Sequence, residues 1–193
     1  MESPNELDQF QIIKVEVVNK LKKHKIPYES WGTGATKTLD HLVGEVIKGE
    51  SALEENEEGQ LVRKLAVVWV NVYYKTSIGE RYHLREDRQI FKDGRKRIRS
   101  LEGSVAEKLQ AGENPDELSV LRALGEELGI NSVESSEVKS ESVTLGDSSS
   151  FPGLLREMKN YYFDVEISED EYKPEGYTEN QTDKDSYFVW EKI

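Results

Sequence analysis

The sequence has 193 residues, of which 36% are hydrophobic and 33% charged, and its formal net charge is -12. This length suits one domain with an appended arm and allows a substantial buried core. The acidic charge argues against broad binding to nucleic acids or anionic membranes, because the summed field repels phosphate groups. The absence of cysteine excludes disulfides, thiolate nucleophiles and cysteine metal sites.

No basic segment followed by an apolar core opens the chain, and no apolar run is long enough to cross a membrane. We therefore expect a cytoplasmic protein without a membrane partner.

Two helices are predicted at the N-terminal end. The first spans residues 3 to 24, with capping-box spacing between Ser3 and Glu6 and an apolar stripe along one side. The second begins at Thr38 and ends at Gly49. We expect residues 1–50 to form a helical arm, the acid-rich stretch 51–59 to be a solvated boundary, and residues 62–193 to form the main domain.

Strand patterns follow this boundary. The stretch "LAVVWVNVYY" is rich in β-branched and aromatic residues, and Asp93-Gly94 predicts a two-residue hairpin turn with positive φ at both positions. Further strands are expected near 133–145, 160–167 and 187–192, and the acidic segment between the last two reads as a loop. Together these elements predict an α/β fold with a mixed sheet and helices packed on it.

The stretch "NPDELSVLRALGEELGI" predicts a well-delimited helix over residues 114–128. Asn114 is expected to cap it in a box with Glu117, and Gly129 to end it. Helical geometry places four leucines with Gly125 on one side, and Ala123 among acidic residues on the other. Two neighbouring carboxylates on such a face suit a hard cation such as Mg²⁺ or Mn²⁺.

This helix resembles the Nudix hydrolase signature, whose second half runs Arg-Glu-apolar-any-Glu-Glu-any-Gly-apolar. The segment "RALGEELGI" (122–130) departs from it at Ala123, where the family places a metal-binding acid. Upstream, "EGSVAEKLQAGENP" looks like a lengthened version of the family's glycine-containing loop. The resemblance covers residues 62–193 and implies a Nudix-like α/β/α sandwich, with the helical arm outside it.

By the same resemblance, Glu126 and Glu127 would bind Mg²⁺ or Mn²⁺, and Arg122 would orient a carboxylate. Glu107 or Glu113, from the preceding loop, could replace the acid missing at Ala123. The competing interpretation is that the two glutamates are solvated charges and that Arg122 and Glu126 form an ordinary i, i+4 ion pair.

A basic stretch surrounds the predicted hairpin. Alternation along "RKRIR" places Arg95, Arg97 and Arg99 on one strand face, where guanidinium groups suit phosphate oxygens. The alternative is that these charges prevent edge pairing of an exposed hairpin.

Three functions remain open from the sequence. The first is a Nudix-like domain that recognises a nucleoside-diphosphate or pyrophosphate compound through an incomplete catalytic box, with binding or weak metal-dependent hydrolysis. The second is an active Mg²⁺-dependent pyrophosphohydrolase with a compensating acid from the loop. The third is a protein-interaction module with a vestigial cleft.

Overall fold

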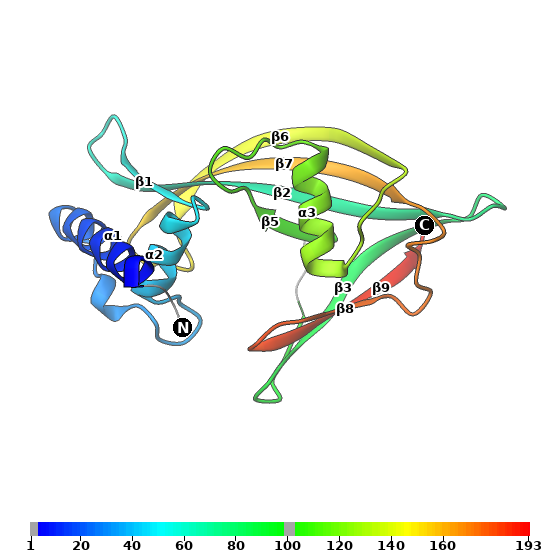
Figure 1. Ribbon diagram of the computed structural model, residues 1–193, viewed down its shortest axis with the longest axis horizontal. Coiled ribbons are helices and arrows are strands. Elements are labelled where there is room, and N and C mark those ends of the chain that lie inside the picture. Colours follow the sequence, from blue (N-terminus) through cyan, green and yellow to red (C-terminus); the bar gives the residue numbers. More distant parts are fainter. Residues whose placement is uncertain (1–3, 99–102) are drawn as a thin grey trace. The chain divides into compact units, whose positions relative to one another are not determined.

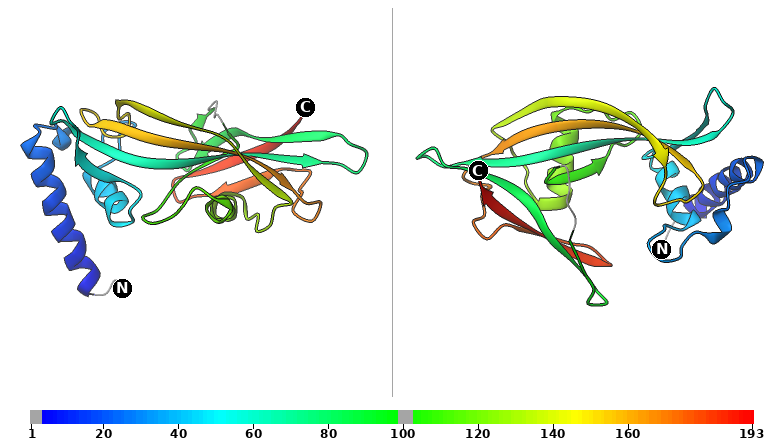
Figure 2. Two further views of the ribbon diagram at one scale, coloured as in Figure 1. Left: turned by 90° about the horizontal axis from the view of Figure 1, so that it is seen from above. Right: turned by 180° about the vertical axis from the view of Figure 1, so that it is seen from behind.

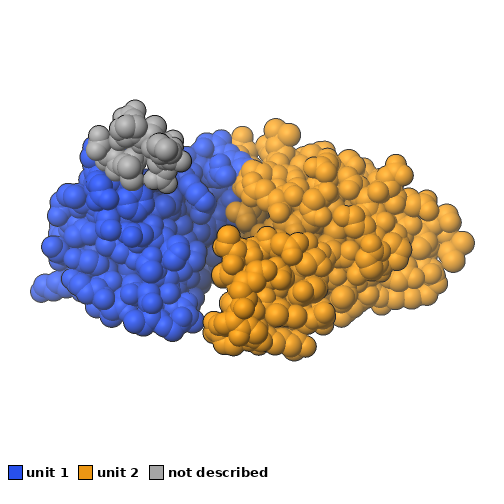
Figure 3. All heavy atoms as spheres, turned by 60° about the horizontal axis from the view of Figure 1, so that its bottom comes forward, with its two compact units in different colours: residues 1–66, 108–113, 142–160 blue, residues 67–107, 114–141, 161–193 orange. Residues whose placement is uncertain are grey.

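The computed structural model describes residues 4–98 and 103–193 (Figure 1). The chain divides into two compact units, coloured separately in Figure 3. Unit 1 comprises Met1–Ala66, Lys108–Glu113 and Ser142–Asn160, and unit 2 comprises Val67–Glu107, Asn114–Glu141 and Tyr161–Ile193.

Unit 1 contains both predicted N-terminal helices. They are α1 (Pro4–Lys23) and α2 (Leu39–Ile47), and a 3-10 turn, η1 (Tyr28–Ser30), lies between them. Thr38 caps α2 as predicted. Its hydroxyl oxygen accepts from the backbone N–H of His41, and the His41 ring nitrogen Nδ1 accepts from the Thr38 backbone N–H. The predicted cap at Ser3 lies outside the described residues.

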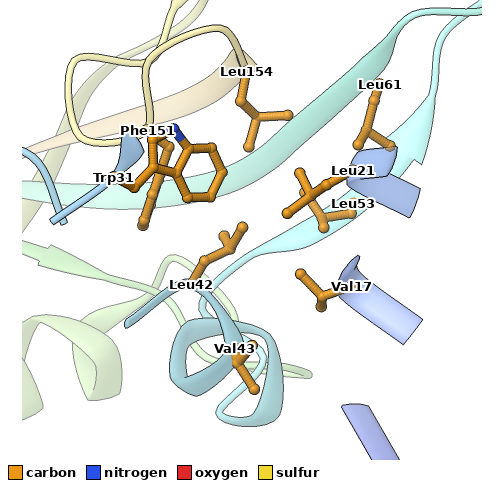
Figure 4. Packing of buried hydrophobic residues seen from close by; sticks show 9 residues of the cluster. All are labelled: Val17, Leu21, Trp31, Leu42, Val43, Leu53, Leu61, Phe151 and Leu154. Atoms are coloured by element: carbon orange, nitrogen blue, oxygen red, sulfur yellow. The ribbon is translucent and has the colours of Figure 1, made fainter. Parts of the chain in front are cut away.

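A hydrophobic core holds unit 1 together (Figure 4). The Trp31 and Phe151 rings lie 5.1 Å apart, and the Trp31 indole donates to the Pro152 carbonyl at 3.0 Å. Leu21 and Leu42 are fully buried in the same cluster. Because Phe151 lies more than a hundred positions from α2 in sequence, the helices depend on a distant segment for their burial.

A buried ionic cluster accompanies this core. The carboxylate of Glu45, only 5% exposed, accepts from Lys37 at 2.8 Å and Lys108 at 2.6 Å on one oxygen. The other oxygen accepts from Arg63 and from the Ser51 hydroxyl. Burial favours the neutral acid, but Arg63 and the two lysines outweigh it and lower the pKa of Glu45 to about 2.

The segment expected to be a solvated boundary contains a short strand that the sequence did not predict. Strand β1 (Ala52–Glu55) pairs antiparallel with the start of β2 (Leu61–Lys75), and Asn56 and Gly59 close the turn. Most of the segment is exposed, as expected; the strand itself was not predicted, because Leu53 is its only large apolar side chain. The arm-and-domain boundary predicted after residue 50 stays a prediction; the compact unit around the helices continues to Ala66.

The strands of unit 2 are joined in the order β6-β7-β2-β3-β9-β8, with β5 beside β2 and β4 beside β3. Strands β2, β5, β6 and β7 have residues in both units. The further bounds are β3 (Arg81–Phe91), β4 (Lys96–Arg97), β5 (Val105–Lys108), β6 (Ser135–Asp147), β7 (Leu155–Ile167), β8 (Tyr177–Asn180) and β9 (Lys184–Lys192). The strands predicted at 65–74, 133–145, 160–167 and 187–192 are therefore confirmed as β2, β6, β7 and β9.

The hairpin between β3 and β4 is present, but its turn differs from the predicted one. The backbone N–H of Phe91 donates to the Arg95 carbonyl at 2.9 Å, so three residues form the loop. Within this turn Gly94 has a positive φ of 87°, whereas the φ of Asp93 is not positive. The side chain of Asp93 instead accepts from the Arg95 backbone N–H at 3.1 Å, a local bond that stabilises this longer turn.

Helix α3 (Glu117–Leu128) is the α-helix of unit 2, within the described residues, and lies on one face of its strands (Figure 2). Val120, Leu124 and Ile130 are fully buried, as are the strand residues Val70 and Leu84. The expected α/β class is thus confirmed. Over residues 4–98 and 103–193, no helix combines the length and apolar character that membrane crossing requires.

Candidate functional site

The ends of α3 are set by side-chain and glycine caps. Asp116, rather than Asn114, is the N-cap: its carboxylate accepts from the backbone N–H groups of Leu118 and Ser119 at 3.0 and 3.2 Å. Ser119 completes the capping box in place of Glu117. The helix ends at Gly129, with φ of 70°, as predicted. The cap prediction was wrong because the sequence offers two overlapping boxes, and the later one forms.

The face that α3 turns to the core also differs from the predicted one. Val120, Ala123, Leu124 and Leu128 are buried, whereas Leu118 is 75% exposed. Ala123 is 0% exposed, so it does not stand in the centre of a solvated acidic face. Two apolar stripes with nearly the same spacing run along this helix, and packing selects the one that contains Ala123 and, one turn later, Glu127.

Glu127 meets carboxyl groups from two other elements. Its side chain forms a hydrogen bond with Glu179 of β8 and lies in the field of Glu107 of β5. Burial, then Glu179 and Glu107, raise the pKa of Glu127 to about 8, against the opposing charge of Lys184. Because two ionised carboxylates cannot hydrogen-bond each other, the pair retains one proton at neutral pH.

Glu179 was not identified from the sequence, because the segment that contains β8 was expected to be a loop. The register of the sheet places Glu179 opposite Ser186 of β9, and Ser186 opposite Gln89 of β3. Directly opposed residues share a face, so these side chains form one row across three strands. Gly176 allows β8 to start there: its φ is +84°, and a Cβ would lie 1.9 Å from the Phe188 carbonyl oxygen.

This row contains buried polar groups. The Gln89 amide donates to Glu86 and to the Ser186 hydroxyl, both at 3.2 Å, and Gln89 is 1% exposed. A carboxylate can only accept, so the bond to Glu86 identifies the Gln89 nitrogen. The face of the strands that carries Glu179 is therefore polar beside the carboxyl pair.

Arg122 and Glu126 form the predicted i, i+4 ion pair, at 3.1 Å. The Arg122 guanidinium also lies 3.9 Å from Glu107. The Glu126 side chain is 55% exposed and turns toward this arginine. The structure therefore brings together Glu107, Arg122 and Glu127, with Glu126 at the margin.

The second acid expected from the loop has a local role. A carboxylate oxygen of Glu113 accepts from the Gln110 backbone N–H at 2.8 Å, and Glu113 belongs to unit 1. Glu107 lies on β5 rather than in a loop, because the stretch predicted as a lengthened loop contains that strand.

The predicted arginines on the hairpin have different surroundings. The Arg95 guanidinium pairs with Asp93 at 2.7 Å and lies over the Phe91 ring, next to the turn. Arg97 is exposed and stands opposite Gln89, so it shares the face of the row that includes Glu179. Arg99 lies outside the described residues.

No group of three or more His, Asp or Glu side chains within residues 4–98 and 103–193 is arranged to hold a metal ion. The donor chemistry nevertheless fits Mg²⁺, which binds through one or two carboxylates and completes its shell with water and substrate phosphates. Glu127 and Glu179 supply two such groups, and Glu107 lies near them.

No protein-family model and no curated protein sequence matches the chain. Among solved structures, it is similar to an Ap4A hydrolase from C. elegans, with 13% identity over 66% of this chain and 80% of that one, at a TM-score of 0.34.

Two further structures bear the Nudix name suggested by the sequence. One is the Nudix domain of Shewanella oneidensis NrtR complexed with ADP ribose, with 12% identity over 67% of this chain and 73% of that one, at a TM-score of 0.37. The other is the Nudix hydrolase RenU of M. smegmatis, with 16% identity over 61% and 69% and a TM-score of 0.31.

Proposed function

We propose that this chain binds a pyrophosphate-containing compound, such as a nucleoside diphosphate linked to another group, through a divalent cation and hydrolyses it weakly. The observation that carries this proposal is the convergence of Glu107, Glu127 and Glu179 from β5, α3 and β8. The Nudix-like spacing of Arg122, Glu126 and Glu127 on α3 supports it.

Glu127 and Glu179 are the residues that would hold Mg²⁺ or Mn²⁺. When bound, the cation neutralises phosphate oxygens and activates water. The two carboxyl groups retain a proton because two negative charges so close together repel each other. A cation bound between them would replace this proton and neutralise the repulsion. Glu179 thus takes the part that the family's signature assigns to the position of Ala123.

Three basic residues would orient the carboxyl groups or neutralise the phosphate. Arg122 spans Glu107 and Glu126, which keeps Glu107 directed toward the helix. Arg97, on the same strand face as Glu179, offers a guanidinium to a phosphate at the exposed end of the row. Lys184 contributes a positive charge beside Glu127.

The test compares Mn²⁺ binding, followed by electron paramagnetic resonance, with release of phosphate or nucleotide from a panel of nucleoside-diphosphate compounds. Two variants are run beside the wild-type chain: Glu127→Gln/Glu179→Gln, which removes the proposed ligands, and Glu126→Gln, which removes a similar charge from the exposed margin. We expect the first to abolish tight Mn²⁺ binding and turnover and the second to retain most of both. Equal Mn²⁺ affinity in all three proteins would refute the proposal.

A further inference from the structure

Strand β6 (Ser135–Asp147) is at the edge of the sheet. It is joined to β7 and to no other strand within the described residues, so one row of its backbone N–H and C=O groups faces outward (Figure 1). Its side chains are exposed along almost the whole strand. An exposed edge of this kind is a template for pairing with another strand.

The usual protection of an edge is weak here. An edge is protected when it is short, or when it carries proline or charged side chains, above all lysine that has no local partner. Strand β6 has 13 residues and no proline, and the apolar side chain of Val138 is 57% exposed. Lys139 is the single basic residue of the strand, and it lies 2.7 Å from Glu137 and 3.8 Å from Asp164.

The charges in the unit 2 part of β6 are self-complementary. Glu137, Lys139 and Glu141 alternate along one face. If this segment meets an identical one antiparallel with the two-fold axis at Val138, Glu137 of each copy stands opposite Lys139 of the other. The two Val138 side chains then face each other on the opposite side of the sheet.

Neighbouring registers are less favourable. An axis at Lys139 places the two lysines against each other and Glu137 against Glu141, and like charges directly opposed are destabilising. An axis at Glu137 places that carboxylate against its own copy. The alternation of charge therefore selects the register centred on Val138 from its immediate neighbours.

We propose that Ser135–Glu141 of β6 pairs antiparallel with the same segment of a second copy of this chain, forming a symmetric dimer with its axis at Val138. The interface is isologous, as a two-fold dimer requires. A single pair of strands buries less surface than a standard interface, so the dimer should be weak, with a dissociation constant in the micromolar range or above, on the order of 1 μM to 1 mM. The dimer does not depend on the carboxyl site of α3.

The test uses sedimentation equilibrium of the full chain at about 0.15 M salt, where long-range repulsion between the acidic copies is screened. Glu137→Lys and Lys139→Glu each convert two unlike pairs into like pairs. We expect each to weaken the dimer about tenfold or more. Glu141→Lys is the matched control for Glu137→Lys, because both substitutions change the net charge by the same amount and both lie on the exposed strand.

Mixing provides the sharpest comparison. In an equimolar mixture of the Glu137→Lys and Lys139→Glu proteins, every opposed pair of the mixed dimer again has unlike charges. We therefore expect the mixture to associate about as strongly as the wild-type chain, although neither protein does so alone. Circular dichroism of each variant establishes that it is folded.

Three results would overturn the proposal. These are a wild-type chain that stays monomeric up to millimolar concentration, a mixture no more associated than its components, and a Glu141→Lys protein weakened as much as Glu137→Lys. The first would leave the edge to a strand from a different protein, and the third would indicate the register centred on Ser140.

Discussion

Replacing Glu127 by Gln should change how the stability of unit 2 depends on pH. The pKa of Glu127 is raised from 4.5 to about 8 in the folded chain by burial and by Glu179 and Glu107. Between these values the folded state holds a proton that the unfolded state has released. The free energy of unfolding of the wild-type chain therefore contains a contribution that is complete below about pH 4.5 and is lost as the pH rises through about 8.

The size of this contribution follows from the shift. Each pKa unit corresponds to about 1.4 kcal/mol, which for this shift gives a ceiling of roughly 5 kcal/mol. Solvent reaches part of the Glu127 side chain and screens the repulsion, so we expect a loss of about 2 kcal/mol. The amide introduced by Glu127→Gln can donate to Glu179 at every pH, as the protonated acid does, and the variant should keep the stability that the wild type loses.

Urea denaturation from pH 4 to 9, followed by tryptophan fluorescence, measures this difference. Wild type and Glu127→Gln should be about equally stable at pH 4, and the variant more stable by about 2 kcal/mol at pH 9. Glu126→Gln, an exposed change one residue away, should run parallel to the wild type. Parallel curves for Glu127→Gln as well would show that Glu127 is not held protonated, and the reasoning about the carboxyl pair would fail.

Three further changes test other parts of the structure. The lowered pKa of Glu45 stabilises the folded chain above about pH 4.5, and this contribution is lost as the pH falls to about 2. Glu45→Gln should therefore abolish most of the acid-induced loss of stability in this range. At pH 7 the substitution should lower the free energy of unfolding by about 3 kcal/mol, measured by urea denaturation, because it leaves Arg63 without its carboxylate partner. Phe151→Ala should lower the free energy of unfolding of unit 1 by about 3 to 5 kcal/mol, and a Phe151→Leu control by much less. Asp116→Ala should cost about 1 kcal/mol through loss of the α3 N-cap, whereas Asn114→Ala, at the wrongly predicted cap, should cost little.

Much of the secondary structure could be predicted because local patterns determine it. Helix α2 begins at Thr38 and α3 ends at Gly129 as expected, since a capping hydroxyl and a left-handed glycine act within a few residues. Strand β2 is apolar enough to be identified alone. The short strands β1 and β8 could not be identified, because each has four residues and one buried apolar side chain, and their pairing partners provide the rest of their stability.

The candidate site shows the same division. The signature on α3 singled out Arg122, Glu126 and Glu127. The structure places Arg122 and Glu127 near other carboxyl groups, among them Glu107 from outside the helix, and leaves Glu126 exposed. The rotation of α3 could not be predicted, because it depends on which of two apolar stripes meets the strands. Glu179 could not be predicted either, because its position depends on the register of β8 on β9, a contact between segments that the sequence shows only as polar.

Ala123 and Glu179 have a common physical explanation. Ala123 is fully buried and lies one turn before Glu127 on the same side of α3, so the side chain of an acid at this position would also be buried. Burial and neighbouring carboxyl groups already raise the pKa of Glu127, and a further acid on this side of α3 would add a desolvated charge without a counter-ion. A small side chain at position 123 avoids such a charge. Under the proposed function, Glu179 supplies from β8 the carboxylate that the Nudix signature places at position 123.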